Sequence, residues 1–177
     1  MISSKYDWQF ATNFTDEKFL KKGKKAGLEP AAASLLYQRG VQTEEALQEF
    51  LEPSLDQLHD PYDLHDMERA VERIRAAIEN YEQILIYGDY DADGMTSASI
   101  VKEALEQLGA ECQVYLPNRF TDGYGPNSSV YKYFIENQGI SLIITVDNGV
   151  AGLEAIELAQ SLGVDVIVTD HHSMPEE

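Results

Sequence analysis

The sequence predicts an α/β protein in which a doubly wound, mainly parallel sheet follows a small helical N-terminal region. The first observation behind this prediction is a set of four short apolar runs rich in β-branched residues: residues 84–87, 112–116, 142–146 and 164–168. Runs of this length and composition are typical of buried strands. The second observation is that helical stretches alternate with these runs. Apolar strands joined by helices form parallel sheets that are covered on both faces.

Residues 1–80 are expected to form helices, because no run there alternates and because apolar residues between Met67 and Ile78 recur at three- and four-residue spacing. Residues 31–36 form one short helical segment, and Thr43 opens another that Pro53 ends. The longest helix begins near Met67 and ends near Asn80, just before the first strand. We therefore expect a helical N-terminal region at residues 1–80 and a sheet domain at residues 81–177.

Three helices should connect the four strands, at residues 96–108, 128–137 and 152–162. Each of these stretches is followed by a glycine, which suits a helix C-terminus. Connections between neighbouring parallel strands are almost always right-handed crossovers, and ligands bind beyond the carboxyl ends of the strands. Acidic and histidine residues follow three of the predicted strands. We therefore expect the functional site at this edge of the sheet.

The composition indicates a globular protein with a strong negative charge. The 177 residues have a formal net charge of −18 and are 44% hydrophobic, enough for one well-packed domain. This charge repels polyanions and argues against a free-standing nucleic-acid-binding module, although bound metal ions would neutralise part of it. One basic cluster is either a solvated helix face or a phosphate contact, and it contains Lys18, Lys21, Lys22, Lys24 and Lys25.

No segment indicates a membrane or an export signal. No stretch reaches the roughly 18 to 20 uninterrupted apolar residues of a membrane helix, and the first residues lack the apolar core of a signal peptide. We therefore expect no membrane partner and a cytoplasmic location. Cys112 is the single cysteine, so an internal disulfide is excluded and a buried, inert thiol is expected.

The loop after the first predicted strand contains three alternating aspartates. In an extended segment Asp89, Asp91 and Asp93 would point the same way. Three carboxylates so close together would repel one another, and a bound cation resolves the repulsion. Gly94 would let the backbone turn, and Thr96 would lie in the first turn of a helix whose N–H groups can hold phosphate oxygens. A calcium loop is excluded because no glutamate stands six residues after the glycine, but an acidic turn remains an alternative.

Two further strand ends add candidate ligands. Asp147 ends the third predicted strand before an Asn-Gly turn, and Asp170, His171 and His172 follow the fourth strand. Consecutive residues of an extended chain point in opposite directions, so one histidine could bind metal while the other faces a substrate phosphate or the core. Asp170 could hold an imidazole tautomer. Carboxylates and imidazoles without thiolates suit Mn²⁺ or Mg²⁺, with zinc or cobalt as alternatives.

The loop after the second predicted strand, residues 117–125, is a candidate substrate loop. Arg119 can make bidentate contact with a phosphate, Tyr124 could stack on a base or ribose, and Gly123 permits close approach of the backbone. The alternative is a surface loop in which Arg119 pairs with Asp122.

The motifs Asp-Tyr-Asp-Ala-Asp-Gly, Asp-Asn-Gly and Asp-His-His together resemble those of the DHH phosphoesterase superfamily. The resemblance runs from about Leu28 to the end, and residues 35–40, 50–53 and 60–62 belong to a part that smaller members would lack. It implies a DHH-type, Rossmann-like sheet and a metal-dependent exonuclease that degrades single-stranded DNA from the 5′ end to mononucleotides in recombination and repair. The implied cofactors are two divalent cations, Mn²⁺ or Mg²⁺. The implied partners are single-stranded DNA with a 5′ end and, as candidates, a single-strand-binding protein and a helicase.

The resemblance also implies roles for the site residues. The metal ligands would be Asp91, Asp93, Asp147 and His171. The catalytic or supporting residues would be His172, Asp170 and Asp89. The substrate contacts would be Arg119, Tyr124, Gly123 and Thr96. Two cations would activate a water as nucleophile, and His172 would donate a hydrogen bond to the scissile phosphate.

The chain departs from the family pattern at its end. Hydrolysing members carry a further metal-binding aspartate and a second domain, whereas only residues 173–177 follow the triplet here. We therefore expect the N-terminal part of a longer enzyme, with little or no activity alone. Two other functions stay open. A DHH phosphoesterase for short oligonucleotides or cyclic dinucleotides is disfavoured by the first 80 residues, and a non-catalytic scaffold in a replication complex is disfavoured by the intact candidate ligands.

Overall fold

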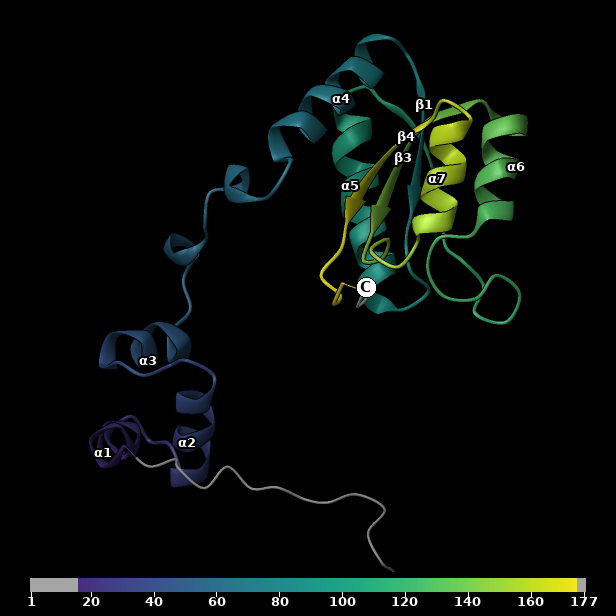
Figure 1. Cartoon of the computed structure of the whole chain (residues 1–177). Coiled ribbons are helices and arrows are strands. Elements are labelled where there is room, and N and C mark those ends of the chain that lie inside the picture. Colours follow the sequence, from purple (N-terminus) through teal and green to yellow (C-terminus); the bar gives the residue numbers. More distant parts are fainter. Residues whose placement is uncertain (1–15, 175–177) are drawn as a thin grey trace, which may run out of the picture. The chain divides into compact units, whose positions relative to one another are not determined.

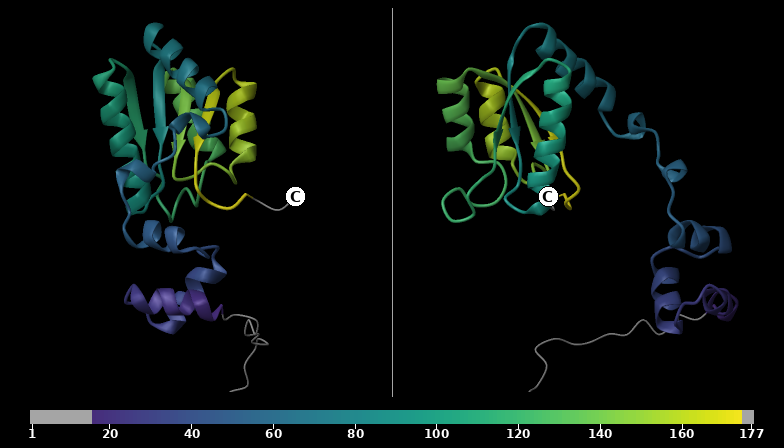
Figure 2. Two further views of the ribbon diagram at one scale, coloured as in Figure 1. Left: turned by 90° about the vertical axis from the view of Figure 1, so that its left-hand side faces the viewer. Right: turned by 180° about the vertical axis from the view of Figure 1, so that it is seen from behind.

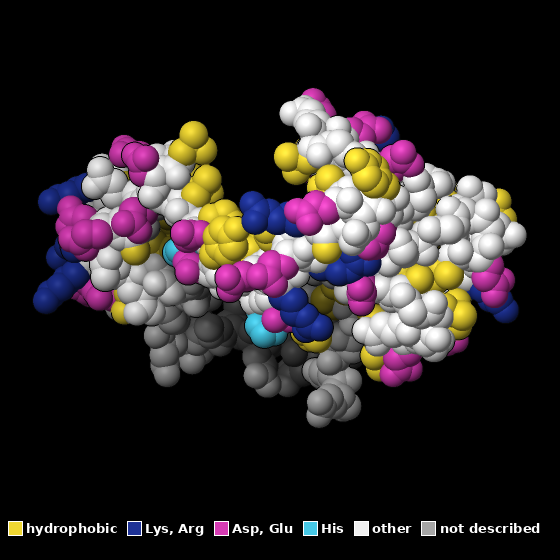
Figure 3. Space-filling model, turned by 90° about the horizontal axis from the view of Figure 1, so that it is seen from above, with side chains coloured by type: hydrophobic (Ala, Val, Ile, Leu, Met, Phe, Trp, Pro, Cys, Tyr) yellow, Lys and Arg dark blue, Asp and Glu magenta, His cyan; other side chains and the backbone are white. Residues whose placement is uncertain are grey.

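The computed structural model describes residues 16–174, which fold as two compact units. The first unit extends to Pro61 and the second begins at Tyr62. Within residues 16–174 no helix combines the length and the apolar character that crossing a membrane requires. Acidic side chains are scattered over the face of the molecule shown in Figure 3, with Lys and Arg between them.

The first unit is a small cluster of helices: α1 (Glu17–Lys25), α2 (Pro30–Gln38), α3 (Glu44–Leu51) and the 3-10 turn η1 (Leu55–Gln57). Phe19, Ala33 and Leu47, one from each α-helix, form its buried core. Thr43 caps α3 by accepting a hydrogen bond from the Ala46 N–H at 3.1 Å. The basic cluster lies on α1, where Lys22 forms an ion pair of 3.0 Å with Glu44.

The second unit is a four-stranded sheet with helices on both faces (Figures 1 and 2). After the 3-10 turn η2 (Pro61–Asp63) its elements are α4 (Met67–Glu79), β1 (Gln83–Tyr87), α5 (Ala92–Gln107), β2 (Glu111–Tyr115), α6 (Ser128–Gln138), β3 (Ile140–Val146), α7 (Leu153–Ser161) and β4 (Asp165–Thr169). The strand order is β2-β1-β3-β4, and every neighbouring pair is parallel. The prediction of a doubly wound parallel sheet is confirmed.

Alternate residues of the central strands serve two separate cores. Ile84 and Ile86 pack with α4 and α5, whereas Leu85 and Tyr87 pack with α6 and α7. Successive side chains of a strand point to opposite faces, so an apolar run without alternation is what a sheet covered on both faces needs. Burial of both faces sets the positions of the strands, and the ends of the strands set where the following loops begin.

Arg73 attaches α4 to the amino ends of the strands. Its guanidinium donates to Glu82 and to Asp165, both at 2.6 Å, and to the Ser141 carbonyl at 3.2 Å. These partners stand at the starts of β1, β4 and β3. Helix α4 therefore packs with the sheet, although it lies within the expected helical region of residues 1–80.

The first connecting helix begins earlier than its sequence suggested. The expected range was residues 96–108, but α5 begins at Ala92, because the Asp91 carboxylate accepts hydrogen bonds from the N–H groups of Asp93 and Gly94, each at 3.0 Å. Gly94 is therefore part of a helix and not of a turn. A Cβ at this position would lie 2.4 Å from the backbone of Asp89, so glycine is required for the close approach of helix and loop.

Candidate metal and phosphate site

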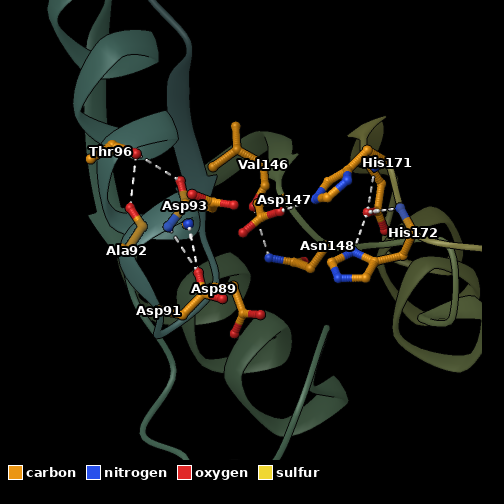
Figure 4. Close-up of polar contacts among 12 residues, drawn as sticks. Asp89, Asp91, Ala92, Asp93, Thr96, Val146, Asp147, Asn148, His171 and His172 are labelled. Atoms are coloured by element: carbon orange, nitrogen blue, oxygen red, sulfur yellow. Dashed lines mark hydrogen bonds and ion pairs between the residues drawn. The ribbon is translucent and has the colours of Figure 1, made fainter. Parts of the chain in front are cut away.

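The loops after β1, β3 and β4 bring carboxylates and imidazoles together at the carboxyl edge of the sheet (Figure 4). Ligand atoms of Asp89, Asp91 and Asp147 lie within 4.8 Å of one another. Ligand atoms of Asp147, His171 and His172 form a second such group. Asp147 belongs to both groups, so it joins the carboxylates after β1 to the imidazoles after β4.

Asp147 lies at the centre of the site in an uncommon backbone conformation. Its φ of 61° is in the left-handed region, which few residues other than Gly, Asn and Asp adopt. Its N–H donates to the Thr169 carbonyl at 3.0 Å, which continues the pairing of β3 with β4. Burial raises the pKa of Asp147 above its ordinary value. The hydrogen bond with His171 opposes this rise, and the charges of Asp91 and Asp93 add to it.

The aspartates after β1 have different environments. Asp89 is buried and accepts a hydrogen bond from the Tyr90 N–H at 2.6 Å, while Asp91 caps α5 through one oxygen, Oδ1. Asp93 lies in the first turn of α5, on the side that faces Asp147 (Figure 4). The expectation that the three alternate along an extended segment is wrong, because the helix has already begun. The two groups of close ligand atoms include Asp89 and Asp91 but not Asp93.

Asp170 organises the histidine pair. Its side chain is 1% exposed and accepts hydrogen bonds from the N–H groups of Val150, His171 and His172 at 2.7 to 3.0 Å. The Nδ1 atom of His172 lies 2.7 Å from the same carboxylate. Burial would raise the pKa of Asp170, but these hydrogen bonds together bring it below its ordinary value. The hydrogen bond that Nδ1 donates to Asp170 raises the pKa of His172 and leaves Nε2 for another partner.

The two histidines do not point in opposite directions, as an extended chain would require. The backbone bends around Asp170, so the rings of His171 and His172 lie side by side with centroids 4.7 Å apart. The Nε2 atom of His171 lies 2.8 Å from Asp147. The sequence identified both histidines. The turn that aligns them depends on the buried carboxylate of Asp170, which also binds the distant Val150 N–H.

Asn148 is a structural member of the site that sequence reasoning treated only as a turn residue. It is 1% exposed, and its Nδ2 donates to the carbonyls of Tyr87 at 3.3 Å and of Val146 at 3.0 Å. One side chain therefore ties the end of β1 to the end of β3. The following Gly149 has a φ of 128°, and a Cβ there would lie 2.6 Å from the Thr145 hydroxyl. The Asn-Gly pair was the available signal, because both residues suit tight backbone conformations.

The candidate substrate residues are only partly gathered at the site. The guanidinium of Arg119 lies over the ring of Tyr90, 5.4 Å from its centroid, and Tyr124 makes an edge contact with His172 at 5.9 Å. Gly123 has a φ of 81° in the same loop. The Thr96 hydroxyl instead bonds to backbone carbonyls of α5 at 2.8 and 3.1 Å.

A pocket of about 330 Å³ opens beside His172. It is lined by three loops, with residues 124–126, residues 149–151 and Asp170, His172 and Ser173. The lining is mostly apolar, whereas the neighbouring Asp147 group is ionic. The site therefore combines a charged part suited to cations and phosphate with an apolar part suited to a ring.

This fold and this site define the class of protein. The family model described as the DHH family, N-terminal domain, matches residues 83–177, and the chain belongs to that family. Among curated proteins it is similar to the single-stranded-DNA-specific exonuclease RecJ. It is 42% identical to RecJ of Bacillus subtilis (strain 168) over 172 residues, which is 97% of this chain and 22% of that protein. It is 40% identical to RecJ of Escherichia coli (strain K12) over 149 residues, covering 83% of this chain and 25% of that protein.

Two solved structures of RecJ have a similar fold. An exonuclease RecJ bound to manganese matches with a TM-score of 0.60 and 32% identity, over 64% of this chain and 29% of that one. RecJ from Thermus thermophilus in complex with Mn²⁺ matches with a TM-score of 0.61 and 26% identity, over 93% of this chain and 22% of that one. The chain thus spans about a quarter or less of the curated relatives described here.

Proposed function

We propose that this chain is the metal-binding part of an exonuclease that hydrolyses single-stranded DNA from its 5′ end to mononucleotides in recombination and repair. The observation that carries the proposal is the position of Asp147. Its carboxylate lies close enough to Asp89 and Asp91 to bind one cation with them, and close enough to His171 and His172 to bind another. The similarity to single-strand-specific exonucleases over 97% of the chain supports the same substrate.

The donor atoms fit divalent cations. Carboxylates and imidazoles in one group, without thiolate, match the preferences of Mn²⁺ and Mg²⁺. Among residues 16–174 no ion pair links Asp89, Asp91 or Asp147 to a lysine or arginine. A bound cation would therefore relieve the repulsion between these carboxylates. We propose Asp91, Asp93, Asp147 and His171 as ligands of two cations, with Asp89 beside them. When bound, the cations would acidify a water and neutralise phosphate charge.

His172 is proposed to act on the substrate phosphate. Asp170 accepts a hydrogen bond from its Nδ1 and raises its pKa, so the imidazolium form, in which Nε2 also carries a proton, persists to higher pH than in a free histidine. An Nε2–H that faces the site can donate to a non-bridging phosphate oxygen, where negative charge increases as the reaction proceeds. Asp170 is a positioning residue in this proposal, because its carboxylate accepts four hydrogen bonds, all of them from groups of the protein.

The substrate loop is proposed to hold the strand. Arg119 would contact a phosphate and Tyr124 would stack on a base or ribose next to His172. Gly123 would allow the loop to approach the strand, and Thr96 would support the first turn of α5. We further propose that residues 81–177 form the N-terminal part of the phosphoesterase domain, behind a helical region at residues 1–80.

The proposed function also implies a location and two partner proteins. A cytoplasmic location follows from a DNA substrate in bacteria such as those of the relatives. A single-strand-binding protein and a helicase are proposed partners, because an exonuclease of this kind needs an unpaired strand. Pull-down with purified candidates in the presence and absence of single-stranded DNA tests these two partners.

Calorimetric titration with Mn²⁺ tests the metal site. The wild type is expected to bind Mn²⁺, and Asp147→Asn to lose most of the binding while keeping the left-handed backbone that asparagine tolerates. Glu136→Gln, an exposed carboxylate of α6, is the matched control and should bind like the wild type. Absence of Mn²⁺ binding by a folded wild type would contradict the metal assignment. The hydrolysis proposal is tested by incubating 5′-phosphorylated single-stranded DNA with Mn²⁺ and identifying released mononucleotides by mass spectrometry.

A further inference from the structure

The loop between β2 and α6 contains a carboxylate that is not directed at the metal site. Asp122 accepts a hydrogen bond from the Tyr115 hydroxyl at 2.7 Å and one from the Asn118 N–H at 2.7 Å, both through Oδ2. Its Oδ1 accepts from the Thr121 hydroxyl at 2.9 Å, and its carbonyl accepts from the Asn127 side chain at 3.1 Å. These bonds join the end of β2, the tip of the loop and the start of α6.

The residues under this loop are packed aromatic rings. Tyr115 packs against Tyr87 and Phe134, with ring centroids 5.4 Å apart in each case. Tyr87 is fully buried, and its hydroxyl donates to the carbonyl of Gly125 at 3.0 Å. Two tyrosines that rise from the sheet therefore hold the loop at two points, Asp122 and Gly125.

The held loop carries Arg119. Between Asn118 and Asp122 the chain makes one tight turn, in which the N–H groups of Thr121 and Asp122 donate to the Asn118 carbonyl at 3.1 and 2.8 Å. Arg119 lies inside this turn and reaches the ring of Tyr90, next to Asp89 and Asp91. The carboxylate of Asp122 and the guanidinium of Arg119 belong to the same turn. Loss of the hydrogen bonds to Asp122 should therefore also free the Arg119 side chain to move.

We infer that Asp122 is a positioning residue that fixes Arg119 at the edge of the metal and phosphate site. The inference rests on the proposed phosphate contact of Arg119 and deepens it. It also replaces the alternative of an Arg119 to Asp122 pair, because the carboxylate is occupied by Tyr115, Asn118 and Thr121. The hydrogen bond from Tyr115 lowers the pKa of Asp122, and burial together with the same bond raises the pKa of Tyr115 to about 12. The ionised carboxylate and the neutral phenol are therefore the stable pair at neutral pH.

The sign of one substitution separates positioning from plain electrostatics. Asp122→Asn removes a negative charge from a chain with a net charge of −18, which by itself should strengthen binding to a DNA strand. If the carboxylate positions Arg119, the same substitution weakens binding. The expected loss is roughly tenfold in Kd, as for a lost charge-assisted hydrogen bond, and the slope of log K against log salt should fall by about 0.7 for one lost phosphate contact. Arg119→Gln should lose the same amount, and the double variant should lose no more.

Glu136→Gln is the matched control, since it removes an equal charge from the exposed face of α6. It should bind DNA at least as tightly as the wild type. Tyr115→Phe keeps the ring that packs against Tyr87 and Phe134 but deletes the hydroxyl, and it should give a smaller loss than Asp122→Asn. Binding is measured by fluorescence anisotropy of a labelled 5′-phosphorylated oligothymidine at low salt with Mn²⁺.

A second measurement does not depend on DNA. Amide hydrogen exchange of residues 117–127, followed by mass spectrometry, should accelerate about tenfold in Asp122→Asn, as for the loss of one charge-assisted hydrogen bond, and stay unchanged in the control variant. Unchanged exchange in Asp122→Asn overturns the inference. So does tighter DNA binding by that variant. If the wild type binds no DNA, the proposed function is contradicted in its substrate contact, and the exchange rates alone decide whether Asp122 holds the loop.

Discussion

Replacing Asn148 by alanine tests how much one buried side chain adds to the pairing of β1 and β3 at their carboxyl ends. Asn148 is 1% exposed and donates two hydrogen bonds to the carbonyls of Tyr87 and Val146. Each bond contributes about 1 kcal/mol net, and a buried carbonyl left without its donor costs about 1 to 3 kcal/mol. The substitution also leaves a small cavity. We expect Asn148→Ala to lower the free energy of unfolding by about 2 to 4 kcal/mol.

The control is the same substitution at the surface. Asn137 also donates to a carbonyl, that of Tyr133 at 3.0 Å, but it is exposed near the end of α6. Water replaces the lost partner there, and alanine is the better helix former, so Asn137→Ala should change stability by less than about 0.5 kcal/mol. Urea unfolding followed by circular dichroism measures both variants in chelator. Equal changes for the two, or a loss below about 1 kcal/mol for Asn148→Ala, would refute the role given to this side chain.

Three further predictions concern the site. In metal-free protein the pKa of His172, measured by NMR, should lie above 6.5 and fall in Asp170→Asn. The raised pKa means that protonated His172, while Asp170 is ionised, stabilises the fold at pH below 6.5. This contribution is lost as the pH rises through the folded pKa of His172, so the variant should differ least from the wild type at high pH. Gly94→Ala should destabilise by about 1 to 3 kcal/mol in thermal unfolding, because its Cβ would lie 2.4 Å from the backbone of Asp89; a wild-type melting temperature would contradict the close approach. Mn²⁺ at about a hundred times its Kd should stabilise the wild type by about 2.7 kcal/mol and should stabilise Asp147→Asn much less, and equal stabilisation of both would place the ion elsewhere.

The sequence was sufficient for the sheet and for the position of the site. The strands lie within two residues of the predicted ranges because burial of both faces demands uninterrupted apolar runs, which local composition records. The carboxyl ends of neighbouring parallel strands meet at one edge, so Asp89, Asp147 and His171 could be expected together from their places after three strands.

Two details of the site differ from the sequence-based expectation, and in each of them an aspartate accepts backbone hydrogen bonds. The alternation of Asp89, Asp91 and Asp93 suggested a strand-like loop, but Asp91 satisfies free N–H groups of α5 and starts the helix four residues early. Likewise the histidine pair lies side by side because Asp170 bonds to Val150, twenty residues away along the chain. The first outcome rests on a local cap, since Asp91 accepts from residues two and three positions later, whereas the second involves a partner that local spacing does not reveal.

The left-handed backbone at Asp147 restricts how this position can change over time. Its φ of 61° admits glycine, asparagine and aspartate at low cost, and a glutamate would add strain as well as length. The proposed metal binding separately demands a carboxylate. A descendant that lost the proposed hydrolysis would be released from the need for a carboxylate but not from the left-handed backbone, so its expected replacements are asparagine and glycine. After such a replacement the left-handed backbone at position 147 would remain, although the carboxylate had been lost.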